Sequence, residues 1–166
     1  EALMALLVEY LKGEINELNS NNVRINVIGN FEQLPDAVYN QVIKAEKITE
    51  NNTGLQINLA LNYGGRADIL RAVKNIAQDV CDKNLSLDDI NEITFSKYLY
   101  TKDIPDPDLL IRTSGEYRIS NFLLYQIAYT ELWFSSVDIM WPDFKPVDLL
   151  SAIIDYQHRN RRYGGI

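Results

Sequence analysis

Apolar residues recur at two different periods along the 166-residue chain, and these periods predict alternating helices and strands. Residues 2–18 repeat apolar side chains every three or four positions, which is typical of a helix with one buried face. Residues 23–29 instead alternate β-branched and polar side chains, which is typical of a strand. The chain therefore begins with a predicted helix followed by a predicted strand.

The same alternation continues to the other end of the chain. Further helices are predicted over about 34–51, 67–83, 86–99, 121–129 and 146–162, and further strands over 55–63, 109–112 and 131–136. Ser120 is expected to cap the helix that begins at Asn121. Strands that alternate with helices pair in parallel through right-handed crossovers. We therefore expect an α/β fold in which a parallel β-sheet is flanked by helices on both faces, in a single domain over 1–166.

Ligands of such sheets bind beyond the carboxyl ends of the strands. Arg112 ends one predicted strand, and Asn62 and Tyr63 end another. Glu131 begins a strand, so it lies at the other end of its element. Arg112, Asn62 and Tyr63 therefore lie at the strand ends where ligands bind, whereas Glu131 needs a different route to such a site.

Charge and composition exclude several classes of protein. The net charge of −7 argues against broad nucleic-acid binding, which needs a basic face. No apolar run approaches the roughly 20 residues of a membrane helix, and no signal peptide is visible. The single cysteine, Cys81, has no partner in the chain and is expected to be a buried or half-buried apolar residue. These features predict a cytoplasmic protein.

The stretch DPDLLIRTSGEYRISNF, residues 106–122, carries the clearest candidate chemistry. Arg112 and Arg118 flank a Thr-Ser-Gly turn, and Ser120 stands where a helix N-terminus would offer unpaired N–H groups. Two guanidinium groups, a hydroxyl and free backbone donors suit a diphosphate. The alternative is that both arginines pair with the nearby Asp106, Asp108 and Glu116, and that Ser120 is only a helix cap. The residues alone leave both interpretations open.

Longer blocks resemble a known family. LNYGGRADI, DPDLLIRTSGEYRISNFLLYQIAYTELWF, MWPDF and the terminal RRYGGI closely resemble the cis-prenyltransferases, the family of undecaprenyl diphosphate synthases, in order and spacing. The resemblance runs from the first predicted helix to the last residue. It implies the cis-prenyltransferase (undecaprenyl diphosphate synthase) type of fold, with Arg112, Arg118 and Ser120 holding the diphosphate of isopentenyl diphosphate.

The resemblance also implies a reaction and a metal. Isopentenyl diphosphate adds to an allylic diphosphate, usually farnesyl diphosphate, and repetition gives a long polyprenyl diphosphate carrier lipid such as undecaprenyl diphosphate for cell-wall synthesis. Glu131 matches the acidic residue associated with Mg²⁺, a cation that prefers carboxylate and phosphate oxygens. Without the resemblance, Glu131 would be interpreted as a solvated carboxylate at a helix end.

The family's tail and product imply partners. RRYGGI resembles a tail that crosses a homodimer interface to the partner's diphosphate site, which points to Arg162 and Gly164, with Arg161 a weaker candidate. The alternative is that the tail is simply a basic helix end.

The apolar polyprenyl product implies that the enzyme contacts the membrane surface peripherally. Alternate residues of the second strand could line a product tunnel or simply pack in the core: Leu55, Ile57, Leu59 and Leu61.

The resemblance fails at one important point. Family members open with a strand and a DGNxRWA-type phosphate loop, whose aspartate is essential, and later carry an STENW-type segment; neither occurs here. We therefore expect the chain to lack the N-terminal strand and phosphate loop, to contain no catalytic residue of its own, and to be inactive as written. The alternative function is a non-catalytic partner subunit of a cis-prenyltransferase heteromer, although such partners generally lose the arginine–serine site.

Overall fold

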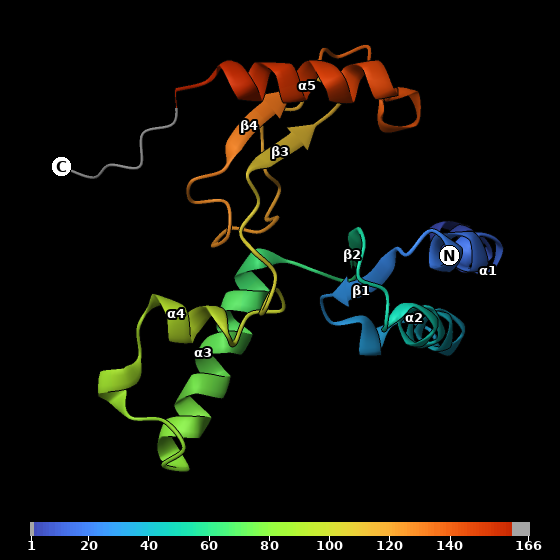
Figure 1. Ribbon diagram of the computed structural model, residues 1–166. Coiled ribbons are helices and arrows are strands. Elements are labelled where there is room, and N and C mark those ends of the chain that lie inside the picture. Colours follow the sequence, from blue (N-terminus) through green and yellow to red (C-terminus); the bar gives the residue numbers. More distant parts are fainter. Residues whose placement is uncertain (1, 161–166) are drawn as a thin grey trace. The chain divides into compact units, whose positions relative to one another are not determined.

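The computed structural model describes residues 2–160. This part of the chain forms two compact units, of which the first ends at Lys102 and the second begins at Asp103. Each unit contains one pair of parallel strands and its own helices (Figure 1). The predicted alternation of helices and strands is present in the first unit, whereas in the second unit no helix separates the two strands.

The first unit begins with the predicted succession of helix and strand. Its leading elements are α1 (Ala2–Ser20), β1 (Arg24–Ile28), α2 (Asp36–Thr49) and β2 (Gln56–Ala60). The two strands pair in parallel, with Ile25 opposite Ile57 and Val27 opposite Leu59. This register places these four apolar residues side by side on one face of the strand pair.

That face is covered by the apolar sides of α1 and α2. The core consists of buried residues from three elements: Leu11, Ile15, Ile25, Val27, Val38, Val42 and Ala45. Leu59 and Leu61 pack against this core, whereas Leu55 is 67% exposed. Leu59 and Leu61 thus contribute to ordinary core packing, which was one of the two roles expected for them.

Side chains of α2 also satisfy backbone groups of β1. The Ile25 N–H donates to Thr49 Oγ1 at 3.0 Å, and the Val27 N–H donates to Glu46 Oε1 at 2.8 Å. Thr49 is fully buried, and its hydroxyl donates in turn to the Ala45 carbonyl at 2.9 Å. The edge of β1 that faces away from β2 is therefore bonded to a helix.

The rest of the first unit is helical. Helix α3 (Gly65–Cys81) follows β2, and the helix predicted over 86–99 is divided into a 3₁₀ turn (Leu87–Asp89) and α4 (Glu92–Ser96). The division occurs at Asn91, which has an extended backbone and whose Oδ1 accepts from the Thr94 N–H, so that it caps α4. Cys81 is exposed, so the prediction that it is buried was wrong.

Hydrogen bonds hold the segment after α4 against α3. The buried Asp68 accepts from Arg71 at 2.9 Å and from the Tyr100 N–H at 3.1 Å. The Tyr98 hydroxyl donates to Asp79 at 2.6 Å, and this hydrogen bond, followed by desolvation, raises the pKa of Tyr98. The chain that leads toward the second unit is thus anchored to one helix.

The second unit contains the remaining strands and helix. These are β3 (Leu109–Arg112), β4 (Glu131–Phe134), a 3₁₀ turn (Trp141–Asp143) and α5 (Pro146–His158). The strands pair in parallel, with Leu109 opposite Glu131 and Arg112 opposite Phe134. His158 is exposed at the end of α5.

One predicted helix of the second unit is absent. Residues 121–129 form successive turns, because Ser120, Asn121 and Leu123 have positive φ values of 47°, 63° and 46°. An L-residue in this left-handed region interrupts a right-handed helix. The prediction of a helix with Ser120 as its cap was therefore wrong, although the apolar pattern of the segment is helical.

Within residues 2–160, no helix is both long and apolar enough to cross a membrane. The tail residues Arg161, Arg162 and Gly164, singled out in the sequence, lie outside the described residues.

Candidate anion-binding site

Arg112 lies at the carboxyl end of β3, as predicted. Its carbonyl accepts the Ser135 N–H at 2.9 Å, which fixes the backbone beside the end of β4. Its half-buried side chain lines a pocket, and among the described residues its guanidinium has no hydrogen bond or ion pair. A cation without a counter-ion at the mouth of a pocket is a suitable anion ligand.

The pocket has a volume of about 280 Å³. This is close to the lower end of the range for small-molecule sites, roughly 300–1,000 Å³. Its lining comes from β3, from the turn after β3 and from neighbouring loops: Leu110, Ile111, Arg112, Thr113, Ser114, Glu116, Ile119, Phe122 and Trp141. A charged group at one side and apolar side chains around it suit a small molecule with an anionic head and an apolar body.

The turn after β3 requires an unusual backbone. Ser114 and Gly115 both have positive φ, at 68° and 61°. A Cβ on Gly115 would lie 3.1 Å from Val137 Cα and would overlap Val137 Cγ1. The Ser114 N–H donates to the Ile139 carbonyl at 2.8 Å, so it is not one of the free backbone donors that were expected at this turn.

Arg118 has a different environment from Arg112. Its Nη1 forms an ion pair with Glu116, and its side chain is 65% exposed. Glu116 lines the pocket, whereas Arg118 does not. The alternative of a nearby carboxylate partner is therefore observed for Arg118 and not for Arg112.

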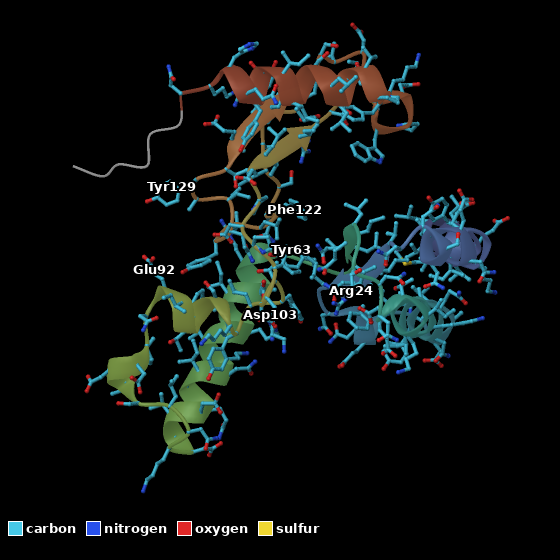
Figure 2. The ribbon with its side chains drawn as sticks, in the orientation of Figure 1. Arg24, Tyr63, Glu92, Asp103, Phe122 and Tyr129 are labelled. Atoms are coloured by element: carbon cyan, nitrogen blue, oxygen red, sulfur yellow. The ribbon has the colours of Figure 1, made fainter. Side chains whose placement is uncertain are left out.

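Ser120 lies on the loop between β3 and β4, is exposed, and does not line the pocket. Figure 2 shows Phe122 and Tyr129 on the same loop, with Tyr129 extending away from the ribbon. Because this loop replaces the predicted helix, no helix dipole acts at Ser120.

Glu131 begins β4, opposite Leu109, so its Cα is three residues before the level of Arg112 in the sheet. Three residues of strand correspond to about 10 Å. Its Oε2 accepts from Arg159 Nη1 at 2.8 Å, and the Glu131 side chain is 25% exposed. The described chain therefore does not bring Glu131 and Arg112 to one point.

Arg159 was not singled out as a site residue in the sequence. Its Nη1 also donates to the Leu132 carbonyl at 2.9 Å, and its Nε donates to Asp155 Oδ2 at 3.1 Å. The hydrogen bond to Glu131, and next the one to Asp155, raise the pKa of the Arg159 guanidinium. The 28 positions that separate Glu131 from Arg159 explain why sequence proximity gave no signal for this contact.

Glu131 is the candidate metal ligand among the described residues. In the part of the chain that the structure describes, no group of three or more His, Cys, Asp or Glu side chains could hold an ion. The bond from Arg159 uses Oε2 of Glu131 and leaves Oε1 outside that pair. A hard divalent cation such as Mg²⁺ fits one carboxylate oxygen when diphosphate oxygens and water complete its shell.

The chain is similar to a family of known proteins over almost its whole length. Residues 1–164 match the family model described as "Putative undecaprenyl diphosphate synthase". The chain is 56% identical to an isoprenyl transferase of Clostridium tetani, over 99% of this chain and 64% of that protein. It is 50% identical to the ditrans,polycis-undecaprenyl-diphosphate synthase ((2E,6E)-farnesyl-diphosphate specific) of Pasteurella multocida, over 99% of this chain and 68% of that protein.

Solved structures agree with these relatives. The chain matches lavandulyl diphosphate synthase from Lavandula x intermedia, solved with dimethylallyl diphosphate, with a TM-score of 0.93 and 38% identity over 98% of this chain and 70% of that one. It matches a probable undecaprenyl diphosphate synthase from Campylobacter jejuni with a TM-score of 0.83 and 32% identity, over 97% and 72% of the two chains. The parallel strands, the flanking helices and these matches together show that the chain belongs to the undecaprenyl diphosphate synthase family, the cis-prenyltransferases.

Proposed function

We propose that the complete protein that carries this sequence is a cis-prenyltransferase. It condenses isopentenyl diphosphate with an allylic diphosphate such as farnesyl diphosphate, and repeated condensation gives a long-chain polyprenyl diphosphate carrier lipid such as undecaprenyl diphosphate. The chain itself spans 64% of the Clostridium tetani relative. The single observation that carries the proposal is that Arg112, which has no ion pair among the described residues, lines a largely apolar pocket in a chain of this family.

In this proposal Arg112 binds the diphosphate of isopentenyl diphosphate. A guanidinium offers two parallel N–H donors to phosphate oxygens, and it keeps its charge at any physiological pH. The apolar side chains of Leu110, Ile119, Phe122 and Trp141 surround the same space. They would hold the five-carbon group and exclude water from the developing positive charge on the allylic partner.

Arg118 and Ser120 would be secondary ligands of the same diphosphate. Arg118 is engaged by Glu116, so it must exchange this carboxylate for a phosphate oxygen. The exchange costs little, because exposed ion pairs contribute only about 0–1 kcal/mol. The exposed Ser120 hydroxyl lies two residues further along the same loop.

Glu131 would hold Mg²⁺ through its carboxylate. When bound, the cation would neutralise negative charge on the diphosphate that departs. Glu131 lies at the opposite end of the strand pair from Arg112. The two residues would therefore contact different diphosphate groups, or would contribute to the active sites of different subunits. The second possibility agrees with the homodimer that the family's tail implies, in which Arg162 and Gly164 reach the partner's diphosphate site.

The setting of the reaction is also a proposal. The protein would act in the cytoplasm and would touch the inner face of the membrane to release its apolar product. A role as a non-catalytic partner subunit is less well supported, because Arg112, Arg118 and Ser120 are all present.

The test is the substitution Arg112→Ala in the complete protein. Loss of a charge-assisted contact worth about 1.5–3 kcal/mol should raise the KM for isopentenyl diphosphate roughly 10- to 100-fold. The KM for farnesyl diphosphate should change by less than about threefold. Steady-state condensation assays with each substrate varied in turn measure both values.

The matched control is Arg24→Ala, which removes an exposed arginine of the first unit. It should leave both KM values unchanged. Equal increases in the two KM values of Arg112→Ala would contradict the assigned role.

A further inference from the structure

Arg159 connects the end of α5 to the beginning of β4. Its guanidinium donates to Glu131 Oε2 at 2.8 Å and to the Leu132 carbonyl at 2.9 Å through Nη1, and to Asp155 through Nε and Nη2. Its side chain is 28% exposed. The arginine is thus held by a strand backbone, a strand side chain and a helix side chain at once.

We propose that Arg159 is a positioning residue, which orients the Glu131 carboxylate so that Oε1 can bind a divalent cation. This inference rests on the proposed function, in which Glu131 is the cation ligand. Arg159 donates a hydrogen bond to Oε2 of Glu131, and this bond restricts rotation of the carboxylate. Oε1 takes no part in the bond. Carboxylate ligands of metals are commonly held in this way by a hydrogen bond from a neighbouring residue.

The contacts of Arg159 indicate that it orients the Glu131 carboxylate and does not compete with the cation for it. Two of its three partners, the Leu132 carbonyl and Asp155, hold the guanidinium in place independently of Glu131. A cation that binds Oε1 therefore does not require Arg159 to leave.

A purely structural role predicts a different result. If Arg159 only fastens α5 to β4, its removal lowers stability by the amount typical of a partly exposed ion pair, about 0–1 kcal/mol. Cation binding by the folded protein would then be unchanged. Affinity for a metal complex therefore separates the two roles.

The experiment uses the complete protein and two probes. Isothermal titration calorimetry measures the binding of Mn²⁺ mixed with inorganic diphosphate, and separately that of inorganic diphosphate in EDTA. Arg159→Gln should weaken binding of the manganese complex about 10-fold, the low end of the loss seen when an outer hydrogen-bond partner is removed. Binding of metal-free diphosphate should stay within about twofold of the unmodified protein.

Two further variants sharpen the comparison. Arg159→Lys keeps the charge but offers a single compact ammonium group, so it should give a smaller loss than Arg159→Gln. Asp155→Asn removes charge from the helix side and leaves the bonds from Arg159 to Glu131 and Leu132 intact. It should change the affinity for the manganese complex by less than about threefold.

The variant Glu131→Gln separates failure of this inference from failure of the proposed function. If Glu131→Gln weakens binding of the manganese complex but Arg159→Gln does not, the role of Arg159 is refuted and the metal ligand stands. Tighter binding in Arg159→Gln, or equal losses in Arg159→Gln and Asp155→Asn, would also refute it. If Glu131→Gln has no effect, Glu131 is not the ligand and both proposals about this residue fall.

Discussion

Two arginines that are six positions apart in the sequence have different surroundings in the second unit. Arg112 ends a strand and lines a pocket with no ion pair among the described residues, whereas Arg118 is exposed and paired with Glu116. A half-buried guanidinium without a counter-ion has a higher free energy than one in an ion pair. Binding of an anion therefore stabilises the unpaired guanidinium more. Arg112 is therefore the stronger candidate of the two.

The ion pair of Arg118 gives a prediction about anion affinity. Glu116→Gln removes a negative charge from the pocket lining and releases Arg118. The affinity for inorganic diphosphate should rise about two- to fivefold at low salt, because exposed pairs contribute at most about 1 kcal/mol and are screened. Calorimetric titration at low and high salt measures the change. Glu9→Gln, on the exposed surface of α1, is the control and should have no effect.

Gly115 is the residue on which the turn after β3 depends most. Gly115→Ala should destabilise the protein by about 1–2 kcal/mol, because a φ of 61° is unfavourable for any residue with a Cβ. The close approach to Val137 adds to this loss, because Val137 Cα is a backbone atom only 3.1 Å from the added Cβ. Urea unfolding measures the loss.

The control for this substitution is Gly13→Ala in α1. A Cβ at Gly13 meets no atom within 4 Å, so alanine should raise helix stability by up to about 1 kcal/mol. Destabilisation of similar size by both substitutions would show that the turn geometry is not the cause.

At the scale of elements, α2 stabilises β1 with hydrogen bonds as well as apolar contacts. Buried backbone N–H groups need acceptors, and Thr49 and Glu46 supply them to Ile25 and Val27. The helix therefore presents a hydroxyl and a carboxylate beside the apolar residues of its buried side.

Thr49→Val tests this arrangement. Valine has nearly the same shape, so packing is kept while the Ile25 N–H loses its acceptor. An unsatisfied buried donor costs about 1–3 kcal/mol, and the unfolding free energy should fall by that amount. Thr53→Val, at an exposed site, should change it by less than about 0.5 kcal/mol. Chemical denaturation of the two variants side by side decides the outcome, and equal losses would contradict the explanation.

The elements also show what the sequence could and could not predict. The strand over 109–112 was predicted with its observed limits, because apolar residues between prolines and a turn have few alternatives. The helix over 121–129 was wrong, because its apolar spacing fits a helix while left-handed residues at Ser120, Asn121 and Leu123 break the backbone. Glycine, and less strongly asparagine and aspartate, are the residues that indicate such a conformation in a sequence, and serine and leucine do not. The pairing of Glu131 with Arg159 could not be predicted either, since it depends on how α5 lies on β4.

At the scale of the whole molecule, family membership and the α/β architecture are confirmed. The single domain expected over 1–166 stays a prediction, because the described chain forms two compact units with one strand pair each. The roles of Arg118, Ser120, Arg162 and Gly164 also stay predictions. They depend on a bound diphosphate and, for the tail, on a second subunit.

Metal removal tests the proposed chemistry at this scale. EDTA should abolish condensation of isopentenyl and farnesyl diphosphates by the complete protein, and Mg²⁺ should restore it. The circular dichroism spectrum and Tm should not change, because no cluster of ligands among residues 2–160 builds a structural metal site. Condensation that persists in EDTA would contradict a role for magnesium.

The hydrogen bonds from β1 to α2 have a further consequence for the behaviour of the protein at high concentration. A bare strand edge is a template on which another molecule can add its own strand, and this is how many proteins begin to aggregate. On the outer edge of β1, the N–H groups of Ile25 and Val27 are already bound to Thr49 and Glu46. An incoming strand would have to displace both side chains, so this edge is protected against the growth of intermolecular sheets.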